Sequence, residues 1–174
     1  MIFFNDKEKF SLISENQAKT EKVASFDLDY TLTKPLDGFS LFNTNENNWQ
    51  LMDKVLDKMK KYQDDGFTLV IFTNQGHFSD IGKLKRKMEG IFNCFFKHGI
   101  HVSIYGSYGR KSTFRKPGIG LWNEFLKDHG KEIKLGESFY CGDAAGREKD
   151  FSDSDLVFAR HVGIDFYTPE LIFN

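Results

Sequence analysis

The most informative segment of this chain is Phe26-Asp27-Leu28-Asp29-Tyr30-Thr31-Leu32. From Val23 the sequence is apolar enough for a buried strand, which ends in two carboxylates one residue apart. Strand alternation puts Asp27 and Asp29 on the same side, at the carboxyl end where open α/β sheets bind ligands. Two like charges this close are costly unless a cation neutralises them or one is protonated. The spacing suggests a hard metal ion such as Mg²⁺, with nucleophilic and acid–base chemistry; alone, it equally fits an Asp-rich turn.

Length and composition restrict the class of protein. The 174 residues predict a single domain over 1–174, with 24 basic and 25 acidic residues and a formal net charge of −1,. Bulk charge therefore does not indicate a nucleic-acid binder, and any basic surface must be local. The two cysteines, Cys94 and Cys141, lack the spacing of a disulfide scaffold or a zinc cluster,. We expect no membrane span and no signal peptide, and an intracellular protein of the cytoplasm or nucleus.

The pattern along the chain predicts alternating strands and helices. Residues 1–22 are expected to form an edge segment or hairpin, and 33–48 a loop or flap over the first strand. The remaining elements, in chain order, are a helix over 49–62, a strand over 68–72, a helix over 81–95, a strand over 101–105, a helix from Lys116-Pro117 to Phe125, and strands over 138–141 and 163–167,. This alternation predicts an α/β fold with a doubly wound parallel sheet and right-handed crossovers.

The strongest predicted strands end in polar residues. Thr73 and Asn74 follow the second of these strands, and Asp143 follows the fourth. The basic pair Arg115-Lys116 begins a helix near the same rim. Carboxylates for a metal, a hydroxyl and amide for phosphate oxygens, and a lysine for charge balance describe a phosphoryl-transfer site.

These motifs resemble, in order, the four motifs of the haloacid dehalogenase superfamily: Asp27-x-Asp29-x-Thr31, then Thr73, then Lys116, then Gly142-Asp143. Within it, the segments 70–75 and 115–117, and above all Gly142-Asp143-Ala144-Ala145-Gly146-Arg147, resemble the 3′-phosphatase domain of polynucleotide kinase/phosphatases. The resemblance runs from about Val23 to the C-terminus. It implies a Rossmann-like haloacid dehalogenase fold with a minimal cap domain or none.

The resemblance also implies roles for residues. Asp27 would be the nucleophile that forms an aspartyl-phosphate, and Asp29 the general acid that later activates water. Thr73 would hold a phosphoryl oxygen, and Lys116 would offset charge on the phosphoaspartate. The implied Mg²⁺ ligands are Asp27, the backbone carbonyl of Asp29, Asp143 and Asp155, the last matching the second acidic position of the fourth motif better than Asp150.

Substrate contacts are expected from a further set of polar and basic residues: Thr31, Asn74, Arg110, Lys111, Arg115 and Arg147. The basic run Lys83 to Lys87 is a solvated helix face or a second DNA contact,. Tyr30 departs from the family pattern, which often has glycine there, and is expected to alter the turn or the entry of the substrate strand.

Two other apparent motif matches are rejected. The loop Gly106 to Thr113 lacks the second glycine of a phosphate-binding P-loop, because Arg110 occupies that position, so we expect neither a 5′-kinase nor a nucleotide cofactor,. Cys141 and Arg147 have the spacing of cysteine phosphatases, but Asp143 inside that loop would repel a phosphate.

The resemblance therefore implies a Mg²⁺-dependent phosphatase that removes 3′-phosphate from DNA ends, with DNA repair proteins as candidate partners. Two alternatives remain open. One is a small-molecule phosphatase of the histidinol-phosphate or sugar-bisphosphate type, and the other is a non-catalytic module that binds nucleic-acid ends.

Overall fold

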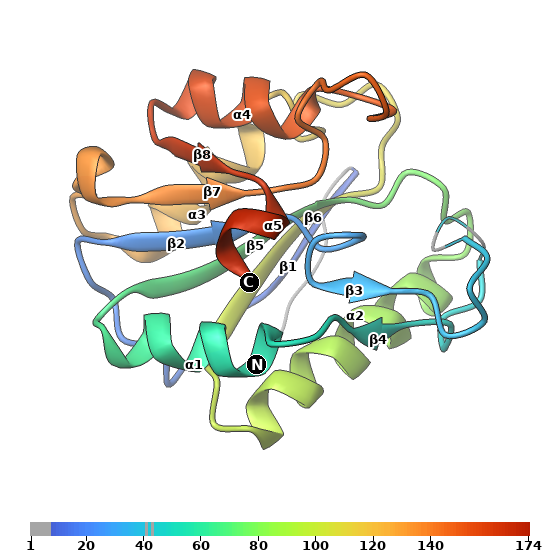
Figure 1. Cartoon of the computed structure of the whole chain (residues 1–174), viewed down its shortest axis with the longest axis horizontal. Coiled ribbons are helices and arrows are strands. Elements are labelled where there is room, and N and C mark those ends of the chain that lie inside the picture. The colour runs from blue at the N-terminus through green and yellow to red at the C-terminus, as the bar shows by residue number, and fades with distance from the viewer. Residues whose placement is uncertain (1–7, 41, 43) are drawn as a thin grey trace.

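The computed structural model describes residues 8–40, 42 and 44–174. Its centre is a six-stranded sheet in the order β1-β6-β5-β2-β7-β8 (Figure 1). The strands are β1 Lys9–Leu12, β2 Val23–Phe26, β5 Thr68–Asn74, β6 Val102–Ser107, β7 Phe139–Cys141 and β8 Asp165–Tyr167. All neighbours are parallel except β1, which runs antiparallel to β6. The predicted α/β sheet is confirmed, with β1 as the edge strand.

Helices cover both faces of this sheet (Figure 1). The first pair, α1 Val55–Asp64 and α2 Ile81–Lys97, lies on one face, and α3 Gly120–His129 and α4 Ser154–Val162 lie on the other. A 3₁₀ turn at Leu135–Glu137, η1, precedes β7, and the short helix α5 Pro169–Ile172 ends the described chain on the side of α1.

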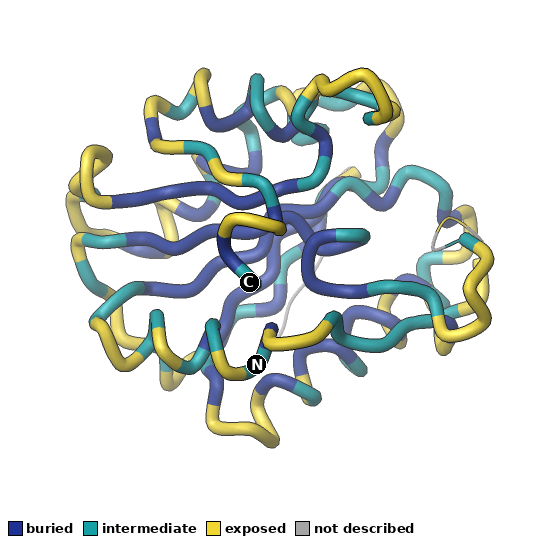
Figure 2. The backbone as a smooth tube through the Cα atoms, viewed as in Figure 1, coloured by how far each residue is buried: buried dark blue, intermediate teal, exposed yellow. Residues whose placement is uncertain are grey.

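Strand β5 separates the two halves of the core. Its residues Leu69 and Ile71 pack with α1 and α2, whereas Val70 and Phe72 pack with α3 and α4. All four side chains are fully buried, as expected of a strand covered on both faces,. Figure 2 shows the same pattern, with buried strands at the centre and exposed residues on turns and outer helix faces.

The order of the strands creates a switch point at β2. From β2 the chain moves to β5 and then β6 on one side, and later returns to build β7 and β8 on the other. Crossovers that leave in opposite directions open a crevice at the carboxyl ends of the central strands, and ligands bind in such crevices. The ends of β2, β5 and β7 are therefore where a site is expected.

Two predicted boundaries are wrong. The helix predicted from Trp49 begins at Val55, because Gln50–Leu51 forms strand β4, which pairs with β3 Thr33–Lys34 inside the predicted loop region. The helix predicted at Lys116-Pro117 begins at Gly120 instead. Of the two possibilities expected for residues 1–22, an edge segment is observed and not a hairpin, since β1 is the edge strand and pairs with the distant strand β6; residues 1–7 lie outside the described residues.

The loop that resembles a P-loop has a packing explanation at its first residue. Gly106 lies in β6 opposite Phe10 of β1, and a Cβ atom there would lie 2.0 Å from the Phe10 ring. The glycine is therefore required by the close contact between the strand and this ring. Among the described residues, no helix is long and apolar enough to cross a membrane.

Phe72 offers a test of this core, because its ring lies within 5.5–6.5 Å of five other aromatic rings: Tyr105, Trp122, Phe125, Tyr140 and Phe158. Phe72→Ala should lower the free energy of unfolding by about 3–5 kcal/mol, since it leaves a cavity between tightly packed rings. Urea denaturation followed by circular dichroism measures this loss. Phe96→Ala is the control, since Phe96 is 51 % exposed, and an equal loss in both variants would contradict the assignment of Phe72 to the core.

Candidate active site

The first two acidic residues of the site follow β2 directly. The Asp27 N–H donates to the carbonyl of Cys141 in β7 at 2.8 Å, so the end of β2 is fixed against its neighbour. The chain then turns tightly, because the N–H groups of Leu32 and Thr33 both donate to the carbonyl of Leu28. Tyr30, at the top of this turn, has a φ of 63°, in the left-handed region where glycine is favoured,.

Asp27 belongs to a cluster of three carboxylates. One oxygen from each of Asp27, Asp143 and Asp155 lies within 4.8 Å of the others. Thr31 lies between two of them, with its hydroxyl 3.3 Å from Asp27 Oδ2 and 3.4 Å from Asp143 Oδ1. Thr31 was expected to contact the substrate, but its side chain is fully buried and does not line the cavity described below. It therefore orients these two carboxylates.

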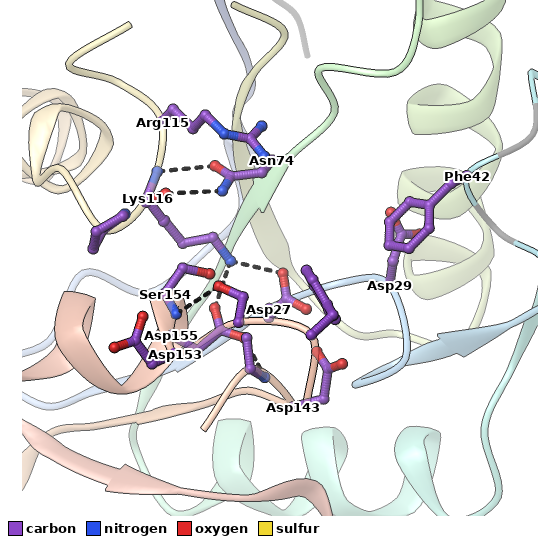
Figure 3. Close-up of a pocket in the computed structure, with 14 residues that line it drawn as sticks. Asp27, Asp29, Phe42, Asn74, Arg115, Lys116, Asp143, Asp153, Ser154 and Asp155 are labelled. Carbon is purple, nitrogen blue, oxygen red and sulfur yellow. Dashed lines mark hydrogen bonds and ion pairs between the residues drawn. The ribbon is translucent and has the colours of Figure 1, made fainter. Parts of the chain in front are cut away.

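Lys116 inserts its ammonium group into this cluster (Figure 3). Its Nζ donates to Asp27 Oδ1 at 2.7 Å, to Asp155 Oδ1 at 2.8 Å and to the Tyr140 hydroxyl at 2.7 Å. The Asn74 side chain also fixes the backbone of Lys116, because it accepts from the N–H and donates to the carbonyl. Asn74 thus positions the lysine from the end of β5.

Burial and mutual repulsion disfavour the charged form of these carboxylates unless a cation neutralises them. Burial raises the pKa of Asp27 well above its ordinary value, against the attraction of Lys116 and together with Asp155 and Asp143. Burial, then Asp155, raises the pKa of Asp143 to about 6. Burial opposes the charge of Lys116, but Asp155 and Asp27 outweigh it and raise the pKa of this ammonium group. The cluster therefore favours a bound cation beyond Lys116.

Asp29 takes part in a second buried network, on the side of α2. Lys87 Nζ donates to Asp29 Oδ1 at 3.0 Å, and Gln75 Nε2 donates to Asp29 Oδ2 at 2.7 Å. The same Gln75 amide donates to the Thr73 hydroxyl at 2.8 Å. Thr73 and Gln75 are both buried at the end of β5, and neither lines the main cavity.

A cavity of about 280 Å³ opens above these groups. Asp27, Asp29, Lys116, Asp143 and Asp155 line its floor and walls, and Figure 3 shows the lysine and its partners at the centre with Phe42 to one side. The other lining residues are Phe42, Asn74, Arg115, Pro117, Ala144 and 151–154. The ends of β2, β5 and β7 and the Lys116 side chain therefore meet at this cavity, where β5 contributes Asn74 and not Thr73.

Asp155 holds the loop after β7 in place. Its Oδ2 accepts the Ala144 N–H at 3.0 Å, and its Oδ1 accepts the Tyr140 hydroxyl at 2.9 Å. Gly142 allows this approach, because a Cβ atom there would lie 2.5 Å from the Asp155 carboxyl group. Asp150, the residue considered less suitable, instead accepts from the side chain of Arg147 outside the cluster.

The predicted substrate contacts divide into two groups. Arg115 lines the main cavity, and Arg110 lines a neighbouring one together with Arg115. Lys111 is exposed and lines neither cavity. Arg147 also lies outside them, because its guanidinium binds Asp150 and Glu170 and donates to the Asp143 carbonyl. Arg147 therefore braces the loop that carries Asp143.

Sequence reasoning missed Lys87, Gln75 and Tyr140 as members of the site. Lys87 was grouped with a solvated or DNA-binding basic run, but only 2 % of it is exposed, so that interpretation is wrong for this residue. A signal was present, since Lys87 is three residues after Leu84 and four before Ile91 and therefore lies on the buried face of α2,. A lysine on an apolar face requires a buried acidic partner.

Comparisons with known proteins agree with this geometry. A family model described as polynucleotide kinase 3 phosphatase matches residues 22–173. A 20.8 kDa protein of Autographa californica nuclear polyhedrosis virus is 42 % identical, over 88 % of this chain and 86 % of its own. The bifunctional polynucleotide phosphatase/kinase of Schizosaccharomyces pombe is 38 % identical over 89 % of this chain, and a polynucleotide 3′-phosphatase of Arabidopsis thaliana is 35 % identical over 88 %. The matched part is 38 % of the yeast relative and 24 % of the plant relative.

Solved structures with lower identity share the fold. A HAD-like structure from Mesorhizobium loti superposes with a TM-score of 0.72 at 14 % identity, over 92 % of this chain and 78 % of that one. The D,D-heptose 1,7-bisphosphate phosphatase of B. bronchiseptica, solved with magnesium and phosphate, gives 0.64 at 18 % identity, over 84 % and 79 %. The predicted haloacid dehalogenase-like fold is confirmed, and the described residues show no separate cap domain.

The buried pair of Lys87 and Asp29 yields a stability prediction. Lys87→Met should lower the free energy of unfolding by about 3 kcal/mol, because it leaves the Asp29 carboxylate buried without its cation. Thermal or urea denaturation measures the change. Lys85→Met is the matched control on the solvent side of α2, where Lys85 is half exposed, and it should change stability by less than about 0.5 kcal/mol.

A double variant separates charge from packing in this test. Adding Asp29→Asn to Lys87→Met should recover part of the lost stability, since the unpaired charge is then gone. If the double variant is less stable than Lys87→Met alone, the loss arises from packing and the ion pair is not its cause.

Proposed function

Because this chain belongs to the polynucleotide kinase 3 phosphatase family, we propose that it is a Mg²⁺-dependent polynucleotide 3′-phosphatase that converts 3′-phosphate ends of DNA to 3′-hydroxyl ends. One observation carries the proposal. The buried carboxylate of Asp27, directly after strand β2, contacts the buried ammonium group of Lys116 in an open cavity that Asp29 also lines. This arrangement supplies a nucleophile, a counter-charge and a proton carrier together.

Asp27 acts as the nucleophile in this proposal. One of its carboxylate oxygens attacks the phosphorus atom, and the bond between phosphorus and the 3′ oxygen breaks. Water then attacks the phosphorus of the aspartyl-phosphate, which releases inorganic phosphate and restores the carboxylate. Lys116 stays within hydrogen-bond distance of Asp27 Oδ1 and offsets the negative charge that collects there,.

Asp29 carries the proton in both halves of the reaction. It gives a proton to the leaving 3′ oxygen and accepts one from the attacking water. Lys87 and Gln75 each contact one oxygen of this carboxylate and so keep it at the cavity wall. Asn74 and Tyr140 act indirectly, because they hold the backbone and the ammonium group of Lys116.

The residues present fit a divalent cation. Lys87 and Lys116 balance two of four carboxylates, and Mg²⁺ would balance the other two. Asp27, Asp143 and the Asp29 carbonyl would hold the ion. Asp155 belongs to the same cluster, although both of its oxygens already accept hydrogen bonds from protein groups. When bound, Mg²⁺ would neutralise the carboxylates and withdraw charge from the phosphoryl oxygens.

The activity is tested by release of inorganic phosphate from three substrates: a 3′-phosphorylated oligonucleotide, its 5′-phosphorylated counterpart and histidinol phosphate. The 3′-phosphorylated strand should be hydrolysed with the highest kcat/KM. Asp27→Asn should lower this rate by several orders of magnitude without changing the melting temperature greatly, because an amide cannot act as the nucleophile. Preferred hydrolysis of histidinol phosphate would favour the small-molecule alternative, and near-normal activity of Asp27→Asn would exclude the aspartyl-phosphate route.

The raised pKa values predict how Mg²⁺ binding depends on pH. Folded Asp143 has a pKa of about 6, above its unfolded value, so its contribution to the stability of the metal-free protein declines as pH rises from about 4 to 6. Protons compete with Mg²⁺ below this pKa. The rise in melting temperature on adding Mg²⁺ should therefore be large at about pH 7.5 and small at about pH 5.

Thermal melts with EDTA and with Mg²⁺ across this pH range measure the effect. Asp143→Asn is the control, since it should lose most of the Mg²⁺-dependent rise at every pH. A rise of equal size at both ends of the range would mean that the ion binds elsewhere.

A further inference from the structure

A buried lysine on α2 contacts the aspartate that carries the proton in the proposed reaction. Lys87 is 2 % exposed, and Leu84 and Ile91, on the same face of α2, are fully buried. The Lys87 ammonium group donates to Asp29 Oδ1 at 3.0 Å. Replacing a buried ion pair by apolar residues of similar size is often neutral or stabilising, so stability alone does not explain a cation at this position.

Lys87 also determines how the side-chain amide of Gln75 is oriented. Its ammonium group donates to Gln75 Oε1 at 3.4 Å. The nitrogen of the same amide donates to Asp29 Oδ2 at 2.7 Å and to the Thr73 hydroxyl at 2.8 Å. The reversed amide would direct its N–H groups at the ammonium group and its oxygen at the carboxylate, and both contacts would be repulsive. The lysine therefore keeps the amide donors directed at Asp29 and Thr73.

The Asp29 carboxylate is consequently held at both of its oxygens. Lys87 donates to Oδ1 and Gln75 donates to Oδ2, while the Thr33 hydroxyl lies 3.5 Å from Oδ1. The Asp29 side chain is only 7 % exposed, and it lines the main cavity together with Asp27. Donors on both oxygens restrict the rotation of the carboxylate, so its orientation toward the cavity is fixed before a substrate binds.

Proton transfer to a leaving oxygen depends on such placement. In the proposed reaction, the bond between phosphorus and the 3′ oxygen breaks as Asp27 bonds to phosphorus, and the proton on Asp29 moves to the 3′ oxygen. General acid–base catalysis contributes about 10²–10⁴-fold, and it requires the two heavy atoms to be within hydrogen-bond distance. A displacement of about 1 Å can cost about 100-fold. The placement of Asp29 therefore matters most for a leaving group that needs a proton.

We propose that Lys87 is a positioning residue that acts through Asp29 and Gln75 to hold the proton carrier against the leaving 3′ oxygen. Lys87 is not among the residues that line the main cavity, so its effect on the reaction passes through these two side chains. This inference rests on the proposed function, since it places the terminal phosphate at Asp27. Helix α2 thereby contributes to the chemical step from outside the four motifs.

Two substrates that differ in one atom test this role: a 3′-phosphorylated oligonucleotide, and the same strand with sulfur in place of its bridging 3′ oxygen. A thiolate leaves without a proton, so the sulfur strand does not need a general acid. Lys87→Met should lower kcat/KM roughly 10- to 100-fold on the oxygen strand and less than about 3-fold on the sulfur strand. Release of inorganic phosphate measures both rates.

The ratio of the two rates separates positioning from folding. Measured on one preparation, this ratio does not depend on the fraction of folded protein, so a loss of stability cannot imitate the expected result. Gln75→Met removes the donor to Asp29 Oδ2 without changing a charge, and it should show the same selective loss on the oxygen strand. Lys85→Met is the matched control, because Lys85 is half exposed on the same helix, and its ratio should equal that of the unchanged protein.

The outcomes distinguish this inference from the proposed function. Equal losses on the two strands in Lys87→Met would overturn the positioning role alone. A selective loss in Lys87→Met that is absent from Gln75→Met would assign the effect to charge and overturn it as well. If the unchanged protein hydrolyses neither strand but releases phosphate from histidinol phosphate, the proposed function and this inference both fail.

Discussion

The site depends on one ammonium group. Lys116 Nζ contacts the end of β2 through Asp27, the start of α4 through Asp155 and the strand β7 through the Tyr140 hydroxyl. Without this cation, two buried carboxylates would face each other at close range, which is strongly unfavourable. The Asn74 side chain, at the end of β5, fixes the backbone of Lys116. Strands β5, β2 and β7 and helix α4 are therefore all linked through this one lysine.

A second lysine has a parallel role on the opposite side of the turn. Lys87 pairs with Asp29 as Lys116 pairs with Asp27, so each aspartate of the motif has its own cation from a different element. The two aspartates therefore belong to separate networks despite their closeness in sequence. This separation explains how neighbouring carboxylates can take different chemical roles, because different environments act on each of them.

The sequence alone was sufficient to predict the parallel sheet and most of the residues that meet at the carboxyl ends of its strands. Apolar strands such as 68–72 and the motif order predicted both, because strand ends and short motifs are local features. It was not sufficient where contacts between distant segments determine the secondary structure or the burial of a residue. The helix after Lys116 starts later than its proline suggested, and Gln50 pairs with Lys34 in a strand instead of joining a helix. Charge alone places Lys87 on a solvated or DNA-binding helix face, whereas its position among the apolar residues of α2 places it inside the protein.

The position of the reacting groups in the sheet determines how local unfolding affects them. Asp27, Asn74 and the Gly142 turn extend from β2, β5 and β7, which are consecutive inner strands, whereas β1 and β8 form the two edges. Edge strands open most readily in local unfolding, while inner strands open only at a free energy close to that of global unfolding. Fraying at either edge of the sheet therefore leaves Asp27, Asn74 and the Gly142 turn in register with one another.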